Sequence, residues 1–235
     1  AQAFASSLEE SGAVSRVGRI RVVLYGSLSL TGLGHGTDRA ILAGLEGNVP
    51  ATVDTDYLLS VRERCAHNGT IHVNGTNAIA YDDDGDMVFD RWKRLAPHPN
   101  GMRFQAFDAQ GNIIDEQVWY SIGGGFIRRG RIDDALISNH EQTPASSQSP
   151  EDSGNDEAAE YGDGVPYPFV SCDGLIDLCR KHHLSIADVV WANETARRSP
   201  QEVRDRLTRI WNVMSHCIDA GCASATPTLP GGLDV

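Results

Sequence analysis

Two histidines, an aspartate and an asparagine lie in glycine-rich stretches that could surround a small ligand. The first stretch, residues 26–38, is rich in Ser and Gly and contains His35 and Asp38 at the start of a predicted helix. Glycines allow close backbone approach, and the free N–H groups that begin a helix favour an anion such as a carboxylate. His35 and Asp38 could form a proton-handling pair, or bind an amino acid as donor and acceptor. The alternative is an ordinary strand-to-helix turn with capping polar groups.

Two further stretches lie beside predicted strands. His98–Met102 (HPNGM) precedes one strand, although Asn-Gly alone also marks a simple turn. Residues 121–126 (SIGGGF) follow another strand, and their three glycines indicate backbone packed against a ligand or another domain, or else a glycine-rich bulge. If the first two stretches form one site, their loops must open at the same edge of the sheet, with the His35 and Asn100 side chains within roughly 10 Å. If they are self-contained turns, with Asn100 at positive φ, at most one belongs to the site.

The strands that would position these loops follow from runs rich in β-branched and aromatic residues, bounded by turn signals. We expect strands at Arg19–Tyr25, Ile71–Val73, Ala78–Tyr81, Met87–Asp90, Met102–Asp108 and Ile113–Tyr120. The acidic run Asp82–Asp86 lacks the glutamate that an EF-hand calcium loop requires, so it is predicted to be an exposed hairpin turn.

Helices are predicted from periodic apolar residues and from the capping residues at their starts. In the first half we expect them at Ala3–Glu10, at Arg39–Glu46 after the cap candidates Thr37 and Asp38, and at Tyr57–Ala66 after Asp54–Asp56. In the second half we expect them at Gly174–His182, at Ala187–Arg197 after Ser185, and at Gln201–Ala220 after Ser199-Pro200.

Together these elements predict an α+β fold, a mixed sheet with helices on one face, over residues 1–132. An acidic tether over 133–164, a helical segment over 165–226 and a linker over 227–235 are expected to follow. Nine acidic residues and no Lys or Arg occupy 133–164, and the Ser/Gln/Pro-rich part from 138 onward is predicted to be disordered. The three helices are too few for a large core of their own, so we expect them to bridge to a neighbouring domain.

Composition excludes several functional classes. The net charge is −12, but the residues outside the acidic tether sum to about −3 and form no basic stripe, which argues against nucleic-acid binding. No run approaches the roughly 18 to 20 apolar residues of a membrane helix. Neither a disulfide framework nor a common zinc pattern fits the cysteines, so reduced thiols in the cytoplasm are expected. The five cysteines are Cys65, Cys172, Cys179, Cys217 and Cys222.

Combined, the glycine-rich stretches resemble the bacterial iron–sulfur-dependent L-serine dehydratases. The resemblance rests on YGSLSLTGLGHGTDRA (Tyr25–Ala40), GNVPATVD (Gly47–Asp54), HPNGMRFQAFD (His98–Asp108), YSIGGGFI (Tyr120–Ile127) and VPYPF (Val165–Phe169). It covers nearly the whole chain outside 138–164. It implies a first domain similar to the allosteric substrate-binding domain of some phosphoglycerate dehydrogenases, followed by a helical domain whose cysteines bind a 4Fe-4S cluster.

The resemblance implies β-elimination from L-serine. An open iron of the cluster polarises the serine hydroxyl, a base removes the α-proton, and the resulting aminoacrylate hydrolyses to pyruvate and ammonia. His35 and His98 are both candidates for the base, with Asp38 orienting an imidazole and Asn100 donating to the substrate or shaping the domain interface. The further substrate-binding candidates are Ser27, Ser29, Thr31, Gly32, Thr37, Gly101, Gly123 and Gly124.

None of the five cysteines lies in a family cluster motif, so the cluster ligands are expected outside this chain and no metal ligand is named within it. The family's SSSHT-type segment and its cluster-binding domain are also missing from these residues. The chain is therefore expected to supply the N-terminal substrate-binding or interface domain of a cytoplasmic, homodimeric L-serine ammonia-lyase, and to be inactive alone. Its expected partners are L-serine and the cluster-binding domain. A serine-sensing regulatory module and a dimerisation domain are the non-catalytic alternatives.

Overall fold

The computed structural model describes residues 1–139 and 164–225, which fall in two compact units. We call residues 1–139 the sheet unit and residues 164–225 the helical unit. Most of the predicted tether (140–163) and the whole predicted linker lie outside the described residues. Within the two described ranges, no helix is both long enough and apolar enough to cross a lipid bilayer.

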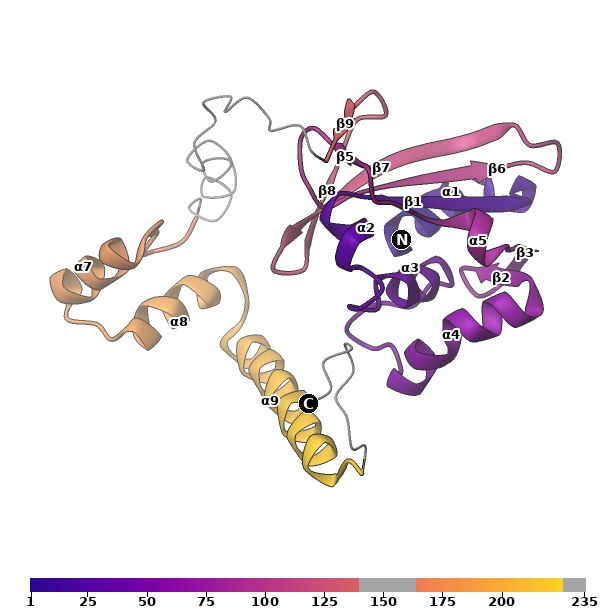
Figure 1. Cartoon of the computed structure of the whole chain (residues 1–235). Coiled ribbons are helices and arrows are strands. Elements are labelled where there is room, and N and C mark those ends of the chain that lie inside the picture. Colours follow the sequence, from indigo (N-terminus) through magenta and orange to yellow (C-terminus); the bar gives the residue numbers. More distant parts are fainter. Residues whose placement is uncertain (140–163, 226–235) are drawn as a thin grey trace. The chain divides into compact units, whose positions relative to one another are not determined.

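A mixed seven-stranded sheet forms the centre of the sheet unit (Figure 1). Its strands are β1 (Arg19–Tyr25), β2 (Thr70–Val73), β3 (Asn77–Ala80), β4 (Met87–Asp90), β6 (Gly101–Phe107), β7 (Ile113–Gly123) and β8 (Phe126–Arg129). The order is β2-β3-β1-β6-β7-β8, with β4 also paired to β1. β1 runs parallel to β3 and β4 but antiparallel to β6, which in turn pairs antiparallel with β7. The predicted α+β fold with a mixed sheet is confirmed.

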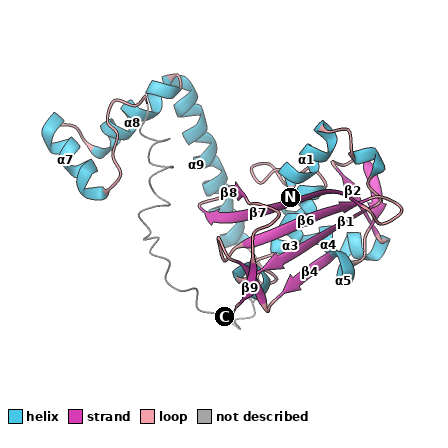
Figure 2. Ribbon diagram, turned by 90° about the horizontal axis from the view of Figure 1, so that it is seen from above, coloured by secondary structure: helices cyan, strands magenta, loops and turns pink. Residues whose placement is uncertain are grey.

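Alternation of side chains along β1 separates the two faces of this sheet. Ile20, Val22 and Leu24 point into the main core, whereas Val23 and Tyr25 point into a smaller cluster on the other face. Three helices supply apolar side chains to the main core, so they cover one face of the sheet (Figure 2). They are α1 (Gln2–Glu10), α3 (Thr37–Leu45) and α4 (Thr55–Asn68).

Local sequence signals explain where α4 begins and ends, and an aromatic contact holds α1 on the sheet. The Asp54 carboxylate accepts a hydrogen bond from the backbone N–H of Tyr57 at 3.0 Å, and Gly69 ends α4 in the left-handed conformation, as the pattern predicts. Phe4 of α1 stacks on Phe104 of β6, with 5.2 Å between ring centroids. The 3-10 turn Val14–Arg16 connects α1 to β1.

The helical unit contains the three predicted helices, α7 (Cys172–His182), α8 (Ile186–Arg197) and α9 (Pro200–Ala223). Serine side chains cap all three, at Ser171, Ser185 and Ser199, and Pro200 occupies the first turn of α9. Among its described residues only Val189 and Val203 are buried apolar side chains. The unit therefore has a small core, as its few helices predicted.

Two loop predictions near the first glycine-rich stretch are wrong. Residues 27–31 form a short helix, α2 (Ser27–Thr31), because the Ser29 and Thr31 hydroxyls donate to the Gly26 and Ser27 carbonyls instead of solvent. Thr37 and Asp38 lie in the first turn of α3 and do not cap it, since Gly36 takes the cap position with a φ of 68°.

The acidic run and the start of the tether also differ from expectation. Asp82–Asp86 is not an exposed hairpin turn: it contains the helical turn α5 (Asp83–Asp86), and Asp86 is only 2% exposed because Arg19 pairs with it. Residues 136–138 of the predicted tether form strand β9 (Leu136–Ser138), which pairs with β5 (Lys93–Leu95) in a separate two-stranded sheet. Backbone pairing therefore orders the beginning of a segment whose composition indicated disorder.

Candidate functional site

The three glycine-rich stretches meet at one edge of the seven-stranded sheet. β1 and β6 are antiparallel with Leu24 opposite Met102, so the end of β1 lies beside the start of β6. β6 and β7 are antiparallel with Gly101 opposite Tyr120, which brings the end of β7 to the same edge. The expectation that the His35 and Asn100 loops start from one edge is confirmed, and the separation of roughly 10 Å between the two side chains stays a prediction.

Backbone hydrogen bonds join the three stretches directly. The N–H of Ser27 donates to the Pro99 carbonyl at 3.0 Å, and the N–H of Ser121 donates to the Asn100 carbonyl at 3.0 Å. Gly26 makes the first of these contacts possible, because its φ is 56° and an added Cβ would lie 2.2 Å from the Pro99 oxygen. The loops are thus held together by the main chain.

His35 follows α2 and is exposed. Its Nδ1 lies 2.9 Å from the Thr31 carbonyl oxygen. A carbonyl oxygen can only accept, so Nδ1 carries the proton and Nε2 of the neutral ring has a free lone pair. His35 therefore presents a proton acceptor in the first glycine-rich stretch.

His98 has the opposite arrangement. Its Nδ1 accepts a hydrogen bond from the Asn100 N–H at 3.1 Å, so the neutral ring carries its proton on Nε2. The ring is partly buried and tilts against Tyr120, with 6.0 Å between centroids. Burial and the positive charge of Arg128 lower the pKa of His98 below its ordinary value. His98 therefore presents a neutral N–H donor.

We expect this difference to be visible in nitrogen NMR spectra of the two imidazoles. The neutral rings should show Nδ1–H for His35 and Nε2–H for His98, and the pKa of His98 should lie below the roughly 6.5 of a free histidine. Replacing Arg128 by Gln removes one of the two causes and should raise the pKa of His98. The same tautomer in both rings, or a pKa of His98 at or above the ordinary value, would contradict the assignment.

Asp38 is buried, and its Oδ2 accepts from Arg62 Nη1 at 2.6 Å. Arg62 also pairs with Asp83 at 2.8 Å, and this second carboxylate accepts from the Tyr81 hydroxyl. The orienting contact that the sequence predicted between Asp38 and an imidazole is replaced by an ion pair, while the Nδ1 atoms of both histidines have backbone partners. Asp38 thus ties the start of α3 to α4 and α5.

Asn100 connects two of the stretches with its side chain, since its Nδ2 donates to the Ser121 carbonyl at 3.2 Å. It does not adopt the positive φ that the simple-turn alternative required; among described residues other than glycine, only Asn74 and His183 do. The N–H of Asn100 also holds the His98 ring, as described above. Asn100 therefore shapes the site edge through three hydrogen bonds.

The remaining substrate-binding candidates fall into two groups by their exposure to solvent. Ser27, Thr31, Gly123 and Gly124 are exposed and Thr37 is partly exposed, whereas Ser29, Gly32 and Gly101 are buried. Gly101 is packed so closely that an added Cβ would lie 2.7 Å from the Leu95 side chain. The buried candidates therefore set the shape of the loops, and the exposed ones remain available to a ligand.

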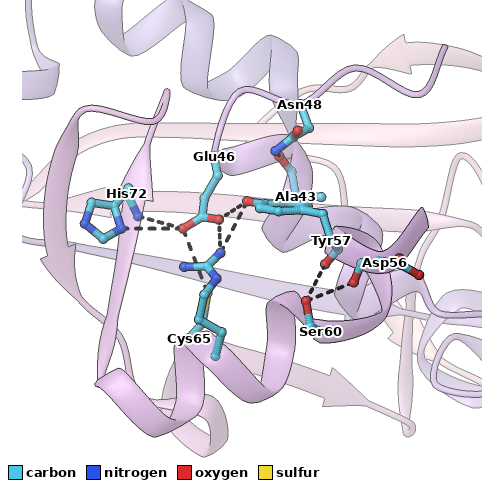
Figure 3. Close-up of polar contacts among 9 residues, drawn as sticks. Ala43, Glu46, Asn48, Asp56, Tyr57, Ser60, Cys65 and His72 are labelled. Carbon is cyan, nitrogen blue, oxygen red and sulfur yellow. Dashed lines mark hydrogen bonds and ion pairs between the residues drawn. The ribbon is translucent and has the colours of Figure 1, made fainter. Parts of the chain in front are cut away.

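Sequence patterns gave no signal for a buried carboxylate network centred on Glu46 (Figure 3). The Glu46 carboxylate accepts hydrogen bonds from the Tyr57 hydroxyl, from Arg64 and from the His72 N–H, the last at 3.0 Å. Burial acts to raise the pKa of Glu46, but these hydrogen bonds outweigh it and hold the pKa below its usual value. The network ties the end of α3 to α4 and β2.

Burial and the neighbouring Glu46 raise the pKa of the buried Cys65 thiol to about 11, so it stays protonated near neutral pH.

The other four cysteines are free thiols on α7 and α9. In the part of the chain that the structure describes, no three His, Cys, Asp or Glu side chains are grouped as a metal site. These residues do not fit a 4Fe-4S cluster, which takes four closely arranged thiolates.

The sequence pattern of the serine dehydratase beta chain matches residues 1–131. Over its full length the chain is 37% identical to an L-serine dehydratase of Streptomyces coelicolor, and over 99% of its length it is 35% identical to L-serine dehydratase 1 of Escherichia coli. An L-serine dehydratase of Mycobacterium tuberculosis is 33% identical over the full chain. The chain spans 47%, 46% and 46% of these relatives, just under half their length. The chain belongs to the serine dehydratase beta-chain family.

Proposed function

We propose that this chain supplies the substrate-binding part of an L-serine ammonia-lyase, which converts L-serine to pyruvate and ammonia. The observation that carries the proposal is the meeting of the three glycine-rich stretches at one sheet edge, with one imidazole that accepts a proton and one that donates. Elimination from an amino acid needs both: a base for the α-proton and donors for the carboxylate. The names of the relatives support L-serine as the substrate.

In this proposal Nε2 of His35 accepts the α-proton. The electron pair of the broken Cα–H bond becomes the Cα–Cβ double bond, and the Cβ–O bond breaks as the hydroxyl group takes up a proton from solvent and leaves as water. The His35 imidazolium returns its proton to solvent, so no net proton is gained or lost. The aminoacrylate that remains tautomerises and is hydrolysed to pyruvate and ammonia. His35 suits this role because its proton is held on Nδ1 by the Thr31 carbonyl, which leaves Nε2 as the acceptor.

His98 binds the serine carboxylate in this scheme. Its lowered pKa keeps the ring neutral, and its Nε2–H is the donor that the Asn100 contact leaves available. Asn100 is then a positioning residue that orients the His98 ring. Asp38 is also a positioning residue, because its ion pair with Arg62 fixes the start of α3 directly after the His35 loop.

We also propose that the 4Fe-4S cluster of the family, with the domain that binds it, belongs to the part of the relatives' length that this chain does not span. The absence of a fitting ligand set among the described residues supports this assignment. No step of the scheme above is derived through the cluster. A homodimeric assembly and a cytoplasmic location complete the proposal, on the strength of the family resemblance.

The test is pyruvate formation from L-serine by the complete protein that contains this chain. Replacing His98 by Gln is expected to raise KM about tenfold with little change in kcat, because a hydrogen bond to the substrate carboxylate acts in the ground state and the transition state alike. Replacing His67, an exposed histidine of α4, by Gln is the matched control and should leave both constants unchanged. A change confined to the lag before full activity would favour a serine-sensing module instead.

A further inference from the structure

A cavity of about 710 Å³ lies in the sheet unit at the edge opposite the three stretches. It is lined by the beginning of β1 (Gly18, Arg19 and Arg21), by Gly85 of α5 and by the turn between β6 and β7. β1 runs from this edge to Tyr25 at the other, so the cavity is separate from the candidate serine site. Its volume lies in the range of small-molecule sites.

Arg21 is the feature of the cavity that needs an explanation. Its Nε is buried and has no hydrogen-bond partner among the described residues. Arg19, two residues earlier on the same strand, is instead paired with Asp86. Leaving a buried charged donor without an acceptor costs about 1–3 kcal/mol or more, so native folds normally provide one.

The carboxylates near Arg21 are engaged elsewhere. Asp108, which also lines the cavity, accepts from the Asn112 side-chain amide at 3.0 Å and from the N–H groups of Asn112 and Gln110 at 2.8 and 2.9 Å, and these hydrogen bonds lower the pKa of Asp108. Gln105 of β6 lies opposite Arg21, and Glu116 of β7 lies opposite Gln105. Glu116 pairs with Arg103 at 3.0 Å. Neither Asp108 nor Glu116 therefore supplies the hydrogen bond that the buried Nε of Arg21 lacks.

We propose that this cavity is a second binding site, for a small anion with a carboxylate or phosphate group, and that Arg21 is its principal ligand. The guanidinium fork of Arg21 matches the paired oxygens of either group. Gly111 leaves open space beside the backbone, since an added Cβ there would have no neighbour within 4 Å. The proposal does not depend on the serine site at the opposite edge.

Titration of the 235-residue chain with inorganic phosphate and, separately, with succinate tests the site. Amide NMR signals of Gly18, Ala109 and Gly111 should shift and saturate at constant ionic strength near 150 mM, a salt level that screens weak surface attraction. Comparison of the two probes decides between phosphate and carboxylate. Arg21→Gln should weaken binding about tenfold or more, and Arg21→Lys should weaken it less. Arg91→Gln removes the same charge at an exposed position beyond the end of β4 and should bind as the unchanged chain does.

Thermal unfolding without added anion separates a ligand-binding arginine from a structural one. Arg21→Gln removes a buried charge without a partner, so its midpoint should equal or exceed that of the unchanged chain. The proposal is overturned if neither probe gives saturable shifts at these three amides, if Arg21→Gln binds as well as the unchanged chain, or if Arg21→Gln lowers the midpoint.

Discussion

Replacing His35 by Gln is expected to lower kcat for L-serine by about 10²- to 10⁴-fold in the complete enzyme, with KM nearly unchanged. Glutamine retains a hydrogen-bonding group of similar reach but cannot accept a proton near neutral pH. The loss should therefore fall on the proton-transfer step, and exchange of the α-deuteron of labelled serine with solvent should disappear together with turnover. Pyruvate formation and deuteron exchange are the two measurements.

The Nε2 assignment also predicts how the two histidines differ. The His98→Gln variant should retain deuteron exchange at saturating serine, because His98 binds the substrate and His35 removes its proton. A reversed pattern, with exchange lost in His98→Gln and kept in His35→Gln, would contradict the tautomers read from the Thr31 and Asn100 contacts. Circular dichroism of both variants should match that of the unchanged protein, since His35 is exposed and His98 is only partly buried.

The second large effect is expected for Glu46→Gln, which should reduce the unfolding free energy of the sheet unit by about 2–3 kcal/mol at neutral pH. The Glu46 side chain is only 4% exposed and receives donors from α4 and β2. A glutamine turns an NH₂ group toward one of these donors and removes the charge that Arg64 pairs with. Native-state hydrogen exchange of the β1 and β6 amides measures the effect on this unit separately from the helical unit.

The pH dependence gives a further signature of the same residue. Because the folded-state pKa of Glu46 is depressed, its stabilising contribution is present above the unfolded-state pKa and is lost as the pH falls through the folded-state value. The difference between the unchanged chain and Glu46→Gln should therefore shrink on acidification. Glu63→Gln, at an exposed position of α4, should stay within about 0.5 kcal/mol of the unchanged chain at every pH.

Elements with strong local signals were predictable to within a few residues. β1 is rich in β-branched residues, and α8 and α9 begin at serines that cap them through their side chains. The Ser27–Thr31 helix was missed because Ser and Gly usually indicate a loop, and its contact with Pro99 comes from a distant position in the chain. Likewise, Asp83 and Asp86 have the composition of a solvated turn, but their partners Arg62 and Arg19 come from distant positions in the chain.

For the site, the sequence predicted that the loops share an edge. It left open which histidine is the base, because the choice depends on hydrogen bonds to Thr31 and from Asn100 that set each tautomer. It did not predict the ion pair of Asp38, since the partner Arg62 lies 24 residues further along the chain. The Glu46 network has no local signature, because its donors lie 11, 18 and 26 residues away along the chain.

The pairing of β1 with β6 has a consequence for the fidelity of the site. Sliding one strand by a single residue would separate Ser27 from Pro99, and it would also turn Ile20, Val22 and Leu24 out of the main core. Such a misaligned sheet would lose several buried aliphatic side chains at once, so it would be a rare excited state that refolds or is degraded. The hydrophobic alternation on β1 thus couples the strand register to burial of the core, so a chain that buries its core also aligns its loops correctly.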